Sequence, residues 1–186
     1  MRRGIIGGTF DPPHLAHLIV AEAARTSLDL DVVTFIPAGA PWQKEGRGVS
    51  HRDHRWAMTC LAIAGVAGFE PDDREVVRDG WSYTAETLET FSGDELFVIL
   101  GADAASRLRS WHRPNDVLAA SAIVAAPRPG TTRADVEAAV GDHHWLDVPD
   151  LPISGTGLRA MRREGRSIRF YVREAVFRYV EENELY

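Results

Sequence analysis

The sequence predicts an α/β fold in which a doubly wound parallel sheet is followed by C-terminal helices. Short apolar stretches of β type alternate with segments of helical periodicity, which is typical of βαβ units. Some stretches, such as Ile5-Ile6 and Leu96–Leu100, are apolar without interruption, as expected of parallel strands covered on both faces. The segment after residue 154 has helical patterns and no further strand pattern. These three observations together define the predicted architecture.

Five strands are predicted from apolar stretches, in chain order Arg3–Gly7, Val32–Ile36, Glu95–Leu100, Ala122–Ala126 and Trp145–Val148. Five helices are predicted among them, at His14–Ser27, Arg52–Ala64, Thr84–Phe91, Asp116–Ala120 and Arg133–Val140. Two loops stand out between these elements, Pro37–Ser50 and Pro127–Arg133. Open α/β sheets bind ligands at the carboxyl ends of their strands, so the first loop is well placed for a functional role.

The segment Gly155–Tyr186 predicts two further helices. An apolar stripe at a spacing of four, which should pack on the rest of the domain, is formed by Val172, Val176 and Val180. Three aromatic residues of the same segment are expected in the core: Phe170, Tyr171 and Tyr179. Because the chain has no repeat and no linker, residues 1–186 are predicted to form one domain with a helical part from about 155.

The composition of the chain excludes several classes of protein. The 186 residues carry a net charge of −6, so no global field attracts the chain to nucleic acid or anionic membranes. A single cysteine, Cys60, excludes an internal disulfide, and no apolar stretch resembles a signal peptide, so we expect a cytoplasmic protein. Of the 21 basic residues, 20 are Arg and one is Lys44. This composition leaves the role of the only lysine open.

The strongest local signal is the segment Gly7-Gly8-Thr9-Phe10-Asp11-Pro12-Pro13-His14-Leu15-Ala16-His17, which joins the first strand to the first helix. Paired glycines allow a close approach of the backbone to a ligand, and a helix start supplies N–H groups and a positive dipole end. His14 and His17 are three residues apart and should lie on one side of the first turn, where both could donate to phosphate oxygens. The segment therefore predicts a phosphate site.

Two other interpretations of this histidine pair remain open. Zinc would need a third ligand, and no cysteine or carboxylate stands at an obvious spacing, so we expect no protein-bound metal. An ordinary strand–helix turn with incidental histidines is common for a glycine pair alone. Two histidines together with Asp-Pro in one connection favour the phosphate site.

A second anion-binding segment is predicted at Ile153-Ser154-Gly155-Thr156-Gly157-Leu158-Arg159. Ser154 is a good N-cap residue, and the hydroxyl groups and Arg159 could hold a phosphate at the helix start. Simple helix capping with a surface arginine is the alternative. Its glycines also fit a dinucleotide fingerprint, which we reject because no strand pattern follows, and the chain has no Walker A sequence.

These segments together resemble the nucleotidyltransferase superfamily that carries a His-x-x-His motif and a Ser/Thr-rich C-terminal motif. The chain is most similar to its nicotinate-nucleotide adenylyltransferase branch. The lysine loop of that branch resembles Ile36-Pro37 with Pro41-Trp42-Gln43-Lys44. Its nicotinate-recognition segment resembles Ser82–Leu88, and its strand end and aromatic pair match Gly101-Ala102-Asp103 and Trp111-His112. The resemblance covers almost the whole chain. It implies a Rossmann-like form of the predicted sheet.

The resemblance implies a reaction in which nicotinate mononucleotide attacks the α-phosphorus of ATP and forms deamido-NAD and pyrophosphate. It assigns catalytic roles to four cationic residues, His14, His17, Lys44 and Arg159. It also assigns ATP contacts to Gly7, Gly8, Thr9, Phe10, His14, His17, Gly101, Asp103, Ser154, Thr156 and Arg159. Contacts to the mononucleotide are assigned to Lys44, Tyr83, Thr84, Asp103, Trp111 and His112. Mg²⁺ should arrive with ATP.

The chain departs from the family pattern at Ala16, Gly155 and Arg173, where Gly, Ser and Pro are usual. Two alternatives therefore stay open: a related adenylyltransferase that uses nicotinamide mononucleotide or phosphopantetheine, and a degenerate paralogue that binds nucleotide without turnover. The Ser82–Leu88 and Gly101–Trp111 segments argue against phosphopantetheine. The sequence leaves open whether the chain forms a homo-oligomer.

Overall fold

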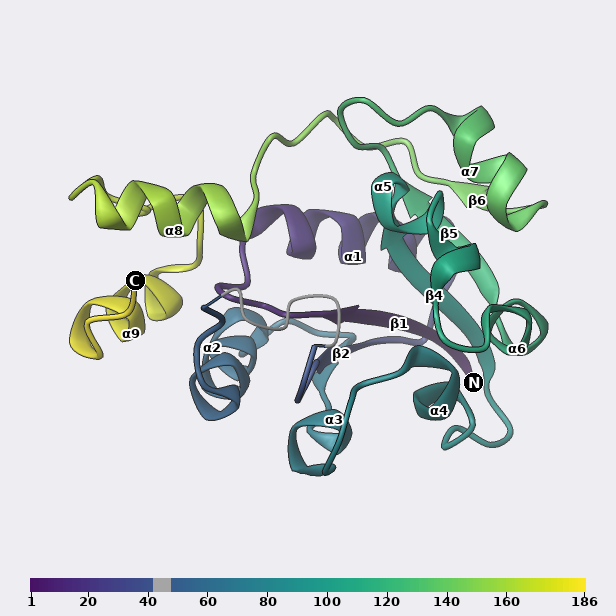
Figure 1. Cartoon of the computed structure of the whole chain (residues 1–186), viewed down its shortest axis with the longest axis horizontal. Coiled ribbons are helices and arrows are strands. Elements are labelled where there is room, and N and C mark those ends of the chain that lie inside the picture. Colours follow the sequence, from purple (N-terminus) through teal and green to yellow (C-terminus); the bar gives the residue numbers. More distant parts are fainter. Residues whose placement is uncertain (42–47) are drawn as a thin grey trace.

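A parallel β-sheet forms the centre of the molecule. The computed structural model describes residues 1–41 and 48–186, and within them six parallel strands have the order β3-β2-β1-β4-β5-β6 (Figure 1). These strands are β1 (Arg2–Gly8), β2 (Val32–Pro37), β3 (Phe69–Pro71), β4 (Glu95–Gly101), β5 (Ala122–Ala126) and β6 (His144–Trp145). The order reverses between β1 and β4, as it does in a doubly wound sheet. The predicted fold class is confirmed.

Helices connect the strands and continue after β6. The helices before β4 are α1 (Leu15–Ser27), α2 (Arg52–Ile63), α3 (Arg74–Val77) and α4 (Thr84–Leu88). Those after it are α5 (Ala102–Ala105), the 3₁₀ helix η2 (Leu108–Ser110), α6 (Pro114–Ala120), α7 (Arg133–Val140), α8 (Gly155–Arg163) and α9 (Glu174–Glu182). In the described part of the chain, no helix has the length and apolar character needed to cross a membrane.

The two faces of the sheet have separate hydrophobic cores. Phe97 and Ile99 of β4 pack with α1, α2, α8 and α9, whereas Leu96, Val98 and Leu100 pack with α4, α5, α6 and α7. This split follows from the alternation of side chains along a strand, which points neighbouring residues to opposite faces. Both faces of β4 are therefore buried, as its uninterrupted apolar sequence predicts.

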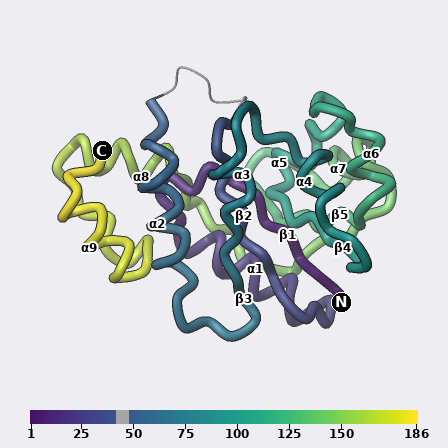
Figure 2. The backbone as a smooth tube through the Cα atoms, turned by 90° about the horizontal axis from the view of Figure 1, so that it is seen from below, coloured from purple at the N-terminus to yellow at the C-terminus, as the bar shows by residue number. Residues whose placement is uncertain are grey.

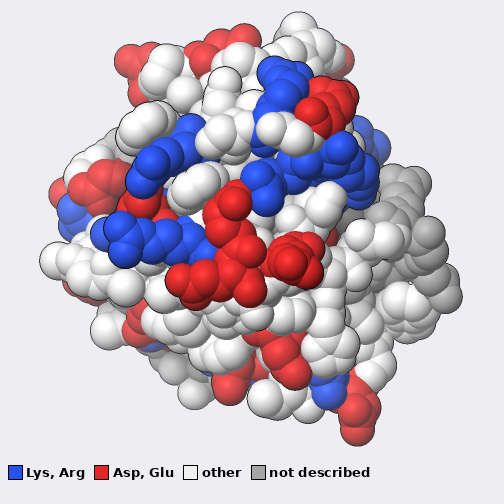
Figure 3. Space-filling model, turned by 90° about the vertical axis from the view of Figure 1, so that its left-hand side faces the viewer, with Lys and Arg blue, Asp and Glu red and all other residues white. Residues whose placement is uncertain are grey.

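The C-terminal helices pack at the end of the molecule occupied by α2, away from the N-terminus (Figures 1 and 2). Val172, Val176 and Val180 are buried, so the predicted apolar stripe is confirmed. Arg173 donates to the carbonyl oxygens of Ala62 (3.2 Å) and Ala64 (2.8 Å) and so caps the end of α2. On the outer surface, Arg and Glu side chains of α8 and α9 are interspersed and paired (Figure 3).

Some sequence predictions are wrong in detail. The pattern missed β3, α3, α5 and η2, which have three or four residues each and are too short for periodicity to show. The last strand lies at His144–Trp145 instead of Trp145–Val148. Phe170 and Tyr171 were expected in the core, but their exposed fractions are 83% and 41%, because they lie in the turn before α9 and outside its apolar stripe.

The strand register opens a crevice at the point where the strand order reverses. β1 and β4 are paired from Arg2–Glu95 to Ile5–Val98, and the register goes no further along these two described strands. The last three residues of each strand are therefore available to line a ligand site. Doubly wound sheets bind their ligands at this place.

Candidate active site

Two cavities lie at the carboxyl ends of β1 and β4. The first, of about 180 Å³, lies between α1, the ends of these strands and the segment Val148–Leu151. The second, of about 370 Å³, lies between β1, β2 and the segment that leads into α4. Five residues line both cavities: Gly7, His17, Leu100, Asp103 and Ala104. The two cavities therefore meet at one wall, which contains the second histidine of the His-x-x-His motif.

The histidine motif forms the start of α1. His14 is the N-cap residue, and its backbone N–H donates to Nδ1 of His17 at 3.1 Å. The two imidazole rings stack with a centroid distance of 3.7 Å, which confirms the expectation that they share one side of the turn. Because Nδ1 of His17 accepts this bond, Nε2 is the nitrogen that carries the proton in the neutral ring. His17 thus presents a donor at the wall shared by both cavities.

Phe10 supports this arrangement from below. It is buried, its φ of 49° is in the left-handed region, and its ring meets the His17 ring edge-on at 5.0 Å. A Cβ atom at Gly8 would lie 3.3 Å from the Phe10 ring, so the second glycine permits this close packing. Among the residues predicted to contact ATP, Gly8 and Thr9 line the second cavity, whereas Phe10 is buried beneath the loop.

The second predicted segment forms the start of α8. Ser154 is the N-cap, and its Oγ accepts a hydrogen bond from the Gly157 N–H at 3.1 Å, as predicted. Arg159 is nine-tenths buried, and it donates to the Asp11 carbonyl oxygen at 2.7 Å and to Thr156 Oγ1 at 3.4 Å. The structure thus joins this segment to the glycine–histidine loop, although Ser154, Thr156 and Arg159 lie outside the linings of both cavities.

Gly155, where the family usually has Ser, lies against the same loop. A Cβ atom there would be 3.0 Å from the Asp11 carbonyl oxygen and 3.4 Å from Nη1 of Arg159. The first distance is tighter than ordinary van der Waals contact, and the second lies at its lower limit. The glycine therefore fits the close approach between α8 and the loop.

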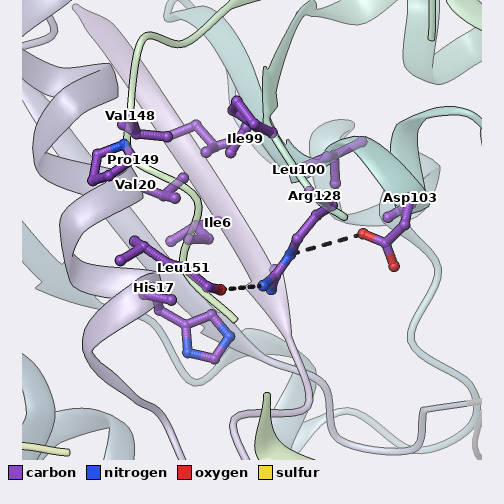
Figure 4. Close-up of a pocket in the computed structure, with 16 residues that line it drawn as sticks. Ile6, His17, Val20, Ile99, Leu100, Asp103, Arg128, Val148, Pro149 and Leu151 are labelled. Carbon is purple, nitrogen blue, oxygen red and sulfur yellow. Dashed lines mark hydrogen bonds and ion pairs between the residues drawn. The ribbon is translucent and has the colours of Figure 1, made fainter. Parts of the chain in front are cut away.

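The first cavity has mostly aliphatic walls and a polar pair at its mouth (Figure 4). Arg128 donates to the carbonyl oxygens of Leu151 (3.4 Å) and Ile153 (3.3 Å), and its Nε lies 4.0 Å from Asp103 Oδ1. Gly101 ends β4 beside this pair, and a Cβ there would be only 2.7 Å from Asp103 Oδ1. The predicted residues Gly101 and Asp103 are thus brought together. Sequence reasoning missed Arg128.

The second cavity contains the residues predicted to contact the mononucleotide, except Lys44. Its lining includes Tyr83, Thr84, Asp103, Trp111 and His112. The Tyr83 and His112 rings stack with a centroid distance of 4.2 Å, although they come from different segments. Lys44 lies outside the described residues.

A hydrogen-bond network that includes three further lining residues, Glu75, Ser82 and Thr87, was missed by the sequence analysis. Glu75 is buried and accepts from the Thr87 hydroxyl, which accepts in turn from Arg78 at 2.8 Å. Burial raises the pKa of Glu75 above its usual value of 4.5, against the opposing effect of these hydrogen bonds. Ser82 ties the network to the end of β2, since its Oγ accepts from the Gly39 N–H at 2.9 Å.

Arg55 holds the loop ends beside the second cavity. It is 1% exposed and donates to four backbone carbonyl oxygens, those of Thr9, Ala38, Gly39 and Ser50. Burial lowers the pKa of its guanidinium, and the nearby Asp11 carboxylate opposes this shift. One sequence signal could have revealed it, because Arg55 occupies the face of α2 that also carries Met58, Thr59 and Ala62.

The described residues contain no group of three or more His, Cys, Asp or Glu side chains that could hold a metal ion. Two carboxylates of this region, Asp11 in the glycine–histidine loop and Asp103 in the shared wall, already have partners. Asp11 accepts from a phenol and a backbone N–H, and Asp103 lies beside Arg107 (3.5 Å) and Arg128.

A doubly wound sheet with two cavities that meet at a His-x-x-His turn is the arrangement expected of a nucleotidyltransferase. Residues 5–161 match the family model described as cytidylyltransferase-like. A relative from Salinibacter ruber, named probable nicotinate-nucleotide adenylyltransferase, is 39% identical over 100% of this chain and 98% of its own. A relative of the same name from Desulfitobacterium hafniense is also 39% identical, over 100% of this chain and 95% of its own.

The fold is shared with nicotinic acid mononucleotide adenylyltransferase from Plasmodium falciparum, whose solved structures are described as complexed with APC and with NaAD. The TM-scores are 0.82 and 0.83 at 17% identity, and the match covers 99% of this chain and 96% of that one. The chain belongs to the nicotinate-nucleotide adenylyltransferase family of the cytidylyltransferase-like nucleotidyltransferases.

Proposed function

We propose that this enzyme transfers AMP from ATP to nicotinate mononucleotide, with formation of deamido-NAD and release of pyrophosphate, as a step of NAD biosynthesis. The observation that carries the proposal is the wall shared by the two cavities. A transfer between two nucleotides requires that the α-phosphorus of one and the phosphate of the other meet in line. Two cavities that meet at His17 provide such a place.

The first cavity is proposed to hold the adenosine of ATP. Its aliphatic walls, which include Ile6, Val20 and Val148, suit the faces of a purine ring. Asp103 and Gly101 stand where a ribose hydroxyl could be bound. Arg128 is a guanidinium donor at the same mouth.

The second cavity is proposed to hold the mononucleotide. Trp111 supplies an aromatic face for the pyridine ring. N–H groups of Tyr83, Thr84 and His112 would bind the carboxylate of nicotinate. Asp103 belongs to both linings, so it would hold a ribose hydroxyl of either substrate.

The chemical step needs positioning and charge stabilisation rather than a general base. The attacking phosphate is already ionised at neutral pH, and the charge that develops lies on the leaving pyrophosphate. His17, with Nε2 as donor, and His14 stacked on it would stabilise this charge. Lys44 and Arg159 would bind the phosphates. Further hydrogen bonds would come from Ser154, Thr156 and the backbone N–H groups of Gly8, Thr9 and Phe10.

Mg²⁺ is proposed to arrive on ATP. The carboxylates near the shared wall already have hydrogen-bond or ion-pair partners, which fits a metal held by phosphate oxygens and water. Bound in this way, Mg²⁺ would neutralise phosphate charge, and the cationic side chains of the protein would orient the triphosphate of ATP.

One assay tests the proposal against both alternatives. Purified protein is incubated with ATP, Mg²⁺ and nicotinate mononucleotide, nicotinamide mononucleotide or phosphopantetheine, and pyrophosphate release is followed. We expect release with nicotinate mononucleotide at a kcat/KM above that of the other two. Turnover with phosphopantetheine alone would overturn the proposal. The absence of pyrophosphate release with all three acceptors would identify a nucleotide-binding paralogue.

A further inference from the structure

Asp11 is a buried carboxylate at which four distant segments of the chain meet. Its Oδ1 accepts a hydrogen bond from the Tyr186 hydroxyl at 2.7 Å, and its Oδ2 accepts from the Ser50 N–H at 3.1 Å. Its backbone carbonyl accepts from Nη1 of Arg159 at 2.7 Å, and the same nitrogen lies 4.0 Å from Oδ2. Only 1% of the Asp11 side chain is exposed, so these partners take the place of water.

The Tyr186 hydroxyl is a permanent donor in this arrangement. Burial, together with the adjacent Asp11 carboxylate, raises the pKa of Tyr186. Since the ordinary pKa of a tyrosine is already about 10, the phenol keeps its proton at neutral pH. It holds one oxygen of Asp11 while the other oxygen is held by the backbone at Ser50.

The docking of α9 does not depend on this hydroxyl. The helix is held by the buried side chains of Val176 and Val180, and the preceding Arg173 donates to the end of α2. A change that removes only the Tyr186 hydroxyl therefore leaves the helix in place.

Arg159 receives its orientation from Asp11. One terminal nitrogen is bound to the Asp11 carbonyl, and its Nε is buried with no hydrogen-bond partner in the described part of the chain. The close approach at Gly155, 3.0 Å from its Cβ position to the Asp11 carbonyl oxygen, leaves little room for the loop to shift without moving the start of α8. The placement of the Asp11 loop thus sets the placement of the guanidinium.

We propose that Tyr186 is a positioning residue of the phosphate site, which acts through Asp11 on Arg159. The inference rests on the proposed function, because Arg159 is assigned there to the ATP phosphates. Tyr186 itself touches no substrate. It fixes the carboxylate of Asp11, and with it the loop that carries the His-x-x-His motif and the carbonyl that orients Arg159.

Tyr186→Phe tests the proposal, with Tyr179→Phe as matched control. The control removes a phenolic hydroxyl from the same C-terminal region, one that bonds His54 Nδ1 at 3.0 Å and does not contact Asp11. We expect Tyr186→Phe to lower kcat/KM for ATP about tenfold, the size expected for loss of a hydrogen bond to a charged group. The KM for the acceptor should change less than about twofold, within ordinary context effects. Tyr179→Phe should keep wild-type kinetics, and identical kinetics of the two variants would overturn the proposal.

A double-mutant cycle separates positioning from general loosening of the fold. In an Arg159→Lys background, Tyr186→Phe should lower kcat/KM for ATP by less than about twofold, because the arginine through which Tyr186 acts is already replaced. Full additivity of the two losses would contradict action through Arg159. Affinity for a non-hydrolysable ATP analogue, measured by calorimetry, does not depend on the acceptor. It should fall for Tyr186→Phe even if nicotinate mononucleotide is not the acceptor. A failure of the Tyr186 proposal is therefore distinguishable from a failure of the proposed function.

Discussion

The two cavities share one wall but hold their polar groups in different ways. In the first, the polar pair Arg128 and Asp103 stands at the mouth, and Arg128 is fixed by backbone carbonyl oxygens of the Leu151–Ile153 segment. In the second, side chains hold one another, since the lining residues Glu75 and Thr87 form a chain of hydrogen bonds with Arg78. The first cavity is thus shaped mainly by the sheet and its connections. The second depends on a local side-chain network.

This difference corresponds to the chemistry of the proposed ligands. A purine ring offers large apolar faces, and aliphatic walls bind it by shape. A pyridine carboxylate must be distinguished by hydrogen bonds, and these require donors held at fixed positions. We therefore expect substitutions in the shared wall to affect both substrates, and substitutions in either separate part to affect one.

The largest effect is expected at the shared wall. His17→Ala should lower kcat by about 100- to 1,000-fold, because the transition state loses a donor at the position where charge develops. Thermal unfolding should change little, and His17→Asn, which keeps an oxygen able to accept from the His14 N–H, should be equally inactive. The matched control is His54→Ala, because His54 lies in α2 and lines neither cavity. Wild-type turnover in His17→Ala would refute the role of the wall.

The sequence predicts the part of this wall that is continuous in the chain. A buried strand, a glycine pair and a helix with two histidines follow one another within Arg3–His17, so local rules place them. The contacts of Asp11 with Tyr186 and of Arg55 with four carbonyl oxygens join residues far apart in sequence, and no periodicity reports such contacts. The Glu75 network was missed because Glu75 stands with Glu70, Asp72 and Asp73 in an acidic stretch of the sequence, which also fits a solvated surface.

The next largest effect separates the second cavity from the first. Trp111→Leu should raise the KM for nicotinate mononucleotide about tenfold, the size expected for loss of one ring-stacking contact. The KM for ATP should stay unchanged, because Trp111 lines only the second cavity. Steady-state kinetics with each substrate varied in turn provide the measurement, and Trp56→Leu in α2 is the control. Equal increases of both KM values would show that the two cavities are not separate.

The reciprocal change is in the first cavity. Arg128→Gln should raise the KM for ATP about three- to tenfold, since it removes a charged donor beside Asp103 and leaves a shorter, neutral side chain. The KM for the mononucleotide should remain near its wild-type value. Arg133→Gln, an exposed position at the start of α7, is the control for a simple change of net charge. A larger effect on the mononucleotide than on ATP would reverse the assignment of the cavities.

The smallest effect concerns the Glu75 network of the second cavity and is measured as the free energy of unfolding at different pH values. Burial raises the pKa of Glu75, so above about pH 4.5 the folded chain keeps a proton that the unfolded chain has released. The folded state then binds more protons, and the free energy of unfolding falls as pH rises until the folded-state pKa is passed. Glu75→Gln removes this titrating group. The free energy of unfolding of the variant should therefore rise relative to that of wild type as pH increases across that range.

Urea unfolding of both proteins from pH 4.5 upward provides this comparison, with the more exposed Glu86→Gln as control. A parallel pH dependence of wild type and Glu75→Gln would contradict a raised pKa. The raised pKa of Glu75 also bears on the proposed ligand, because it disfavours the ionised form, whose charge in the second cavity would repel the carboxylate of nicotinate.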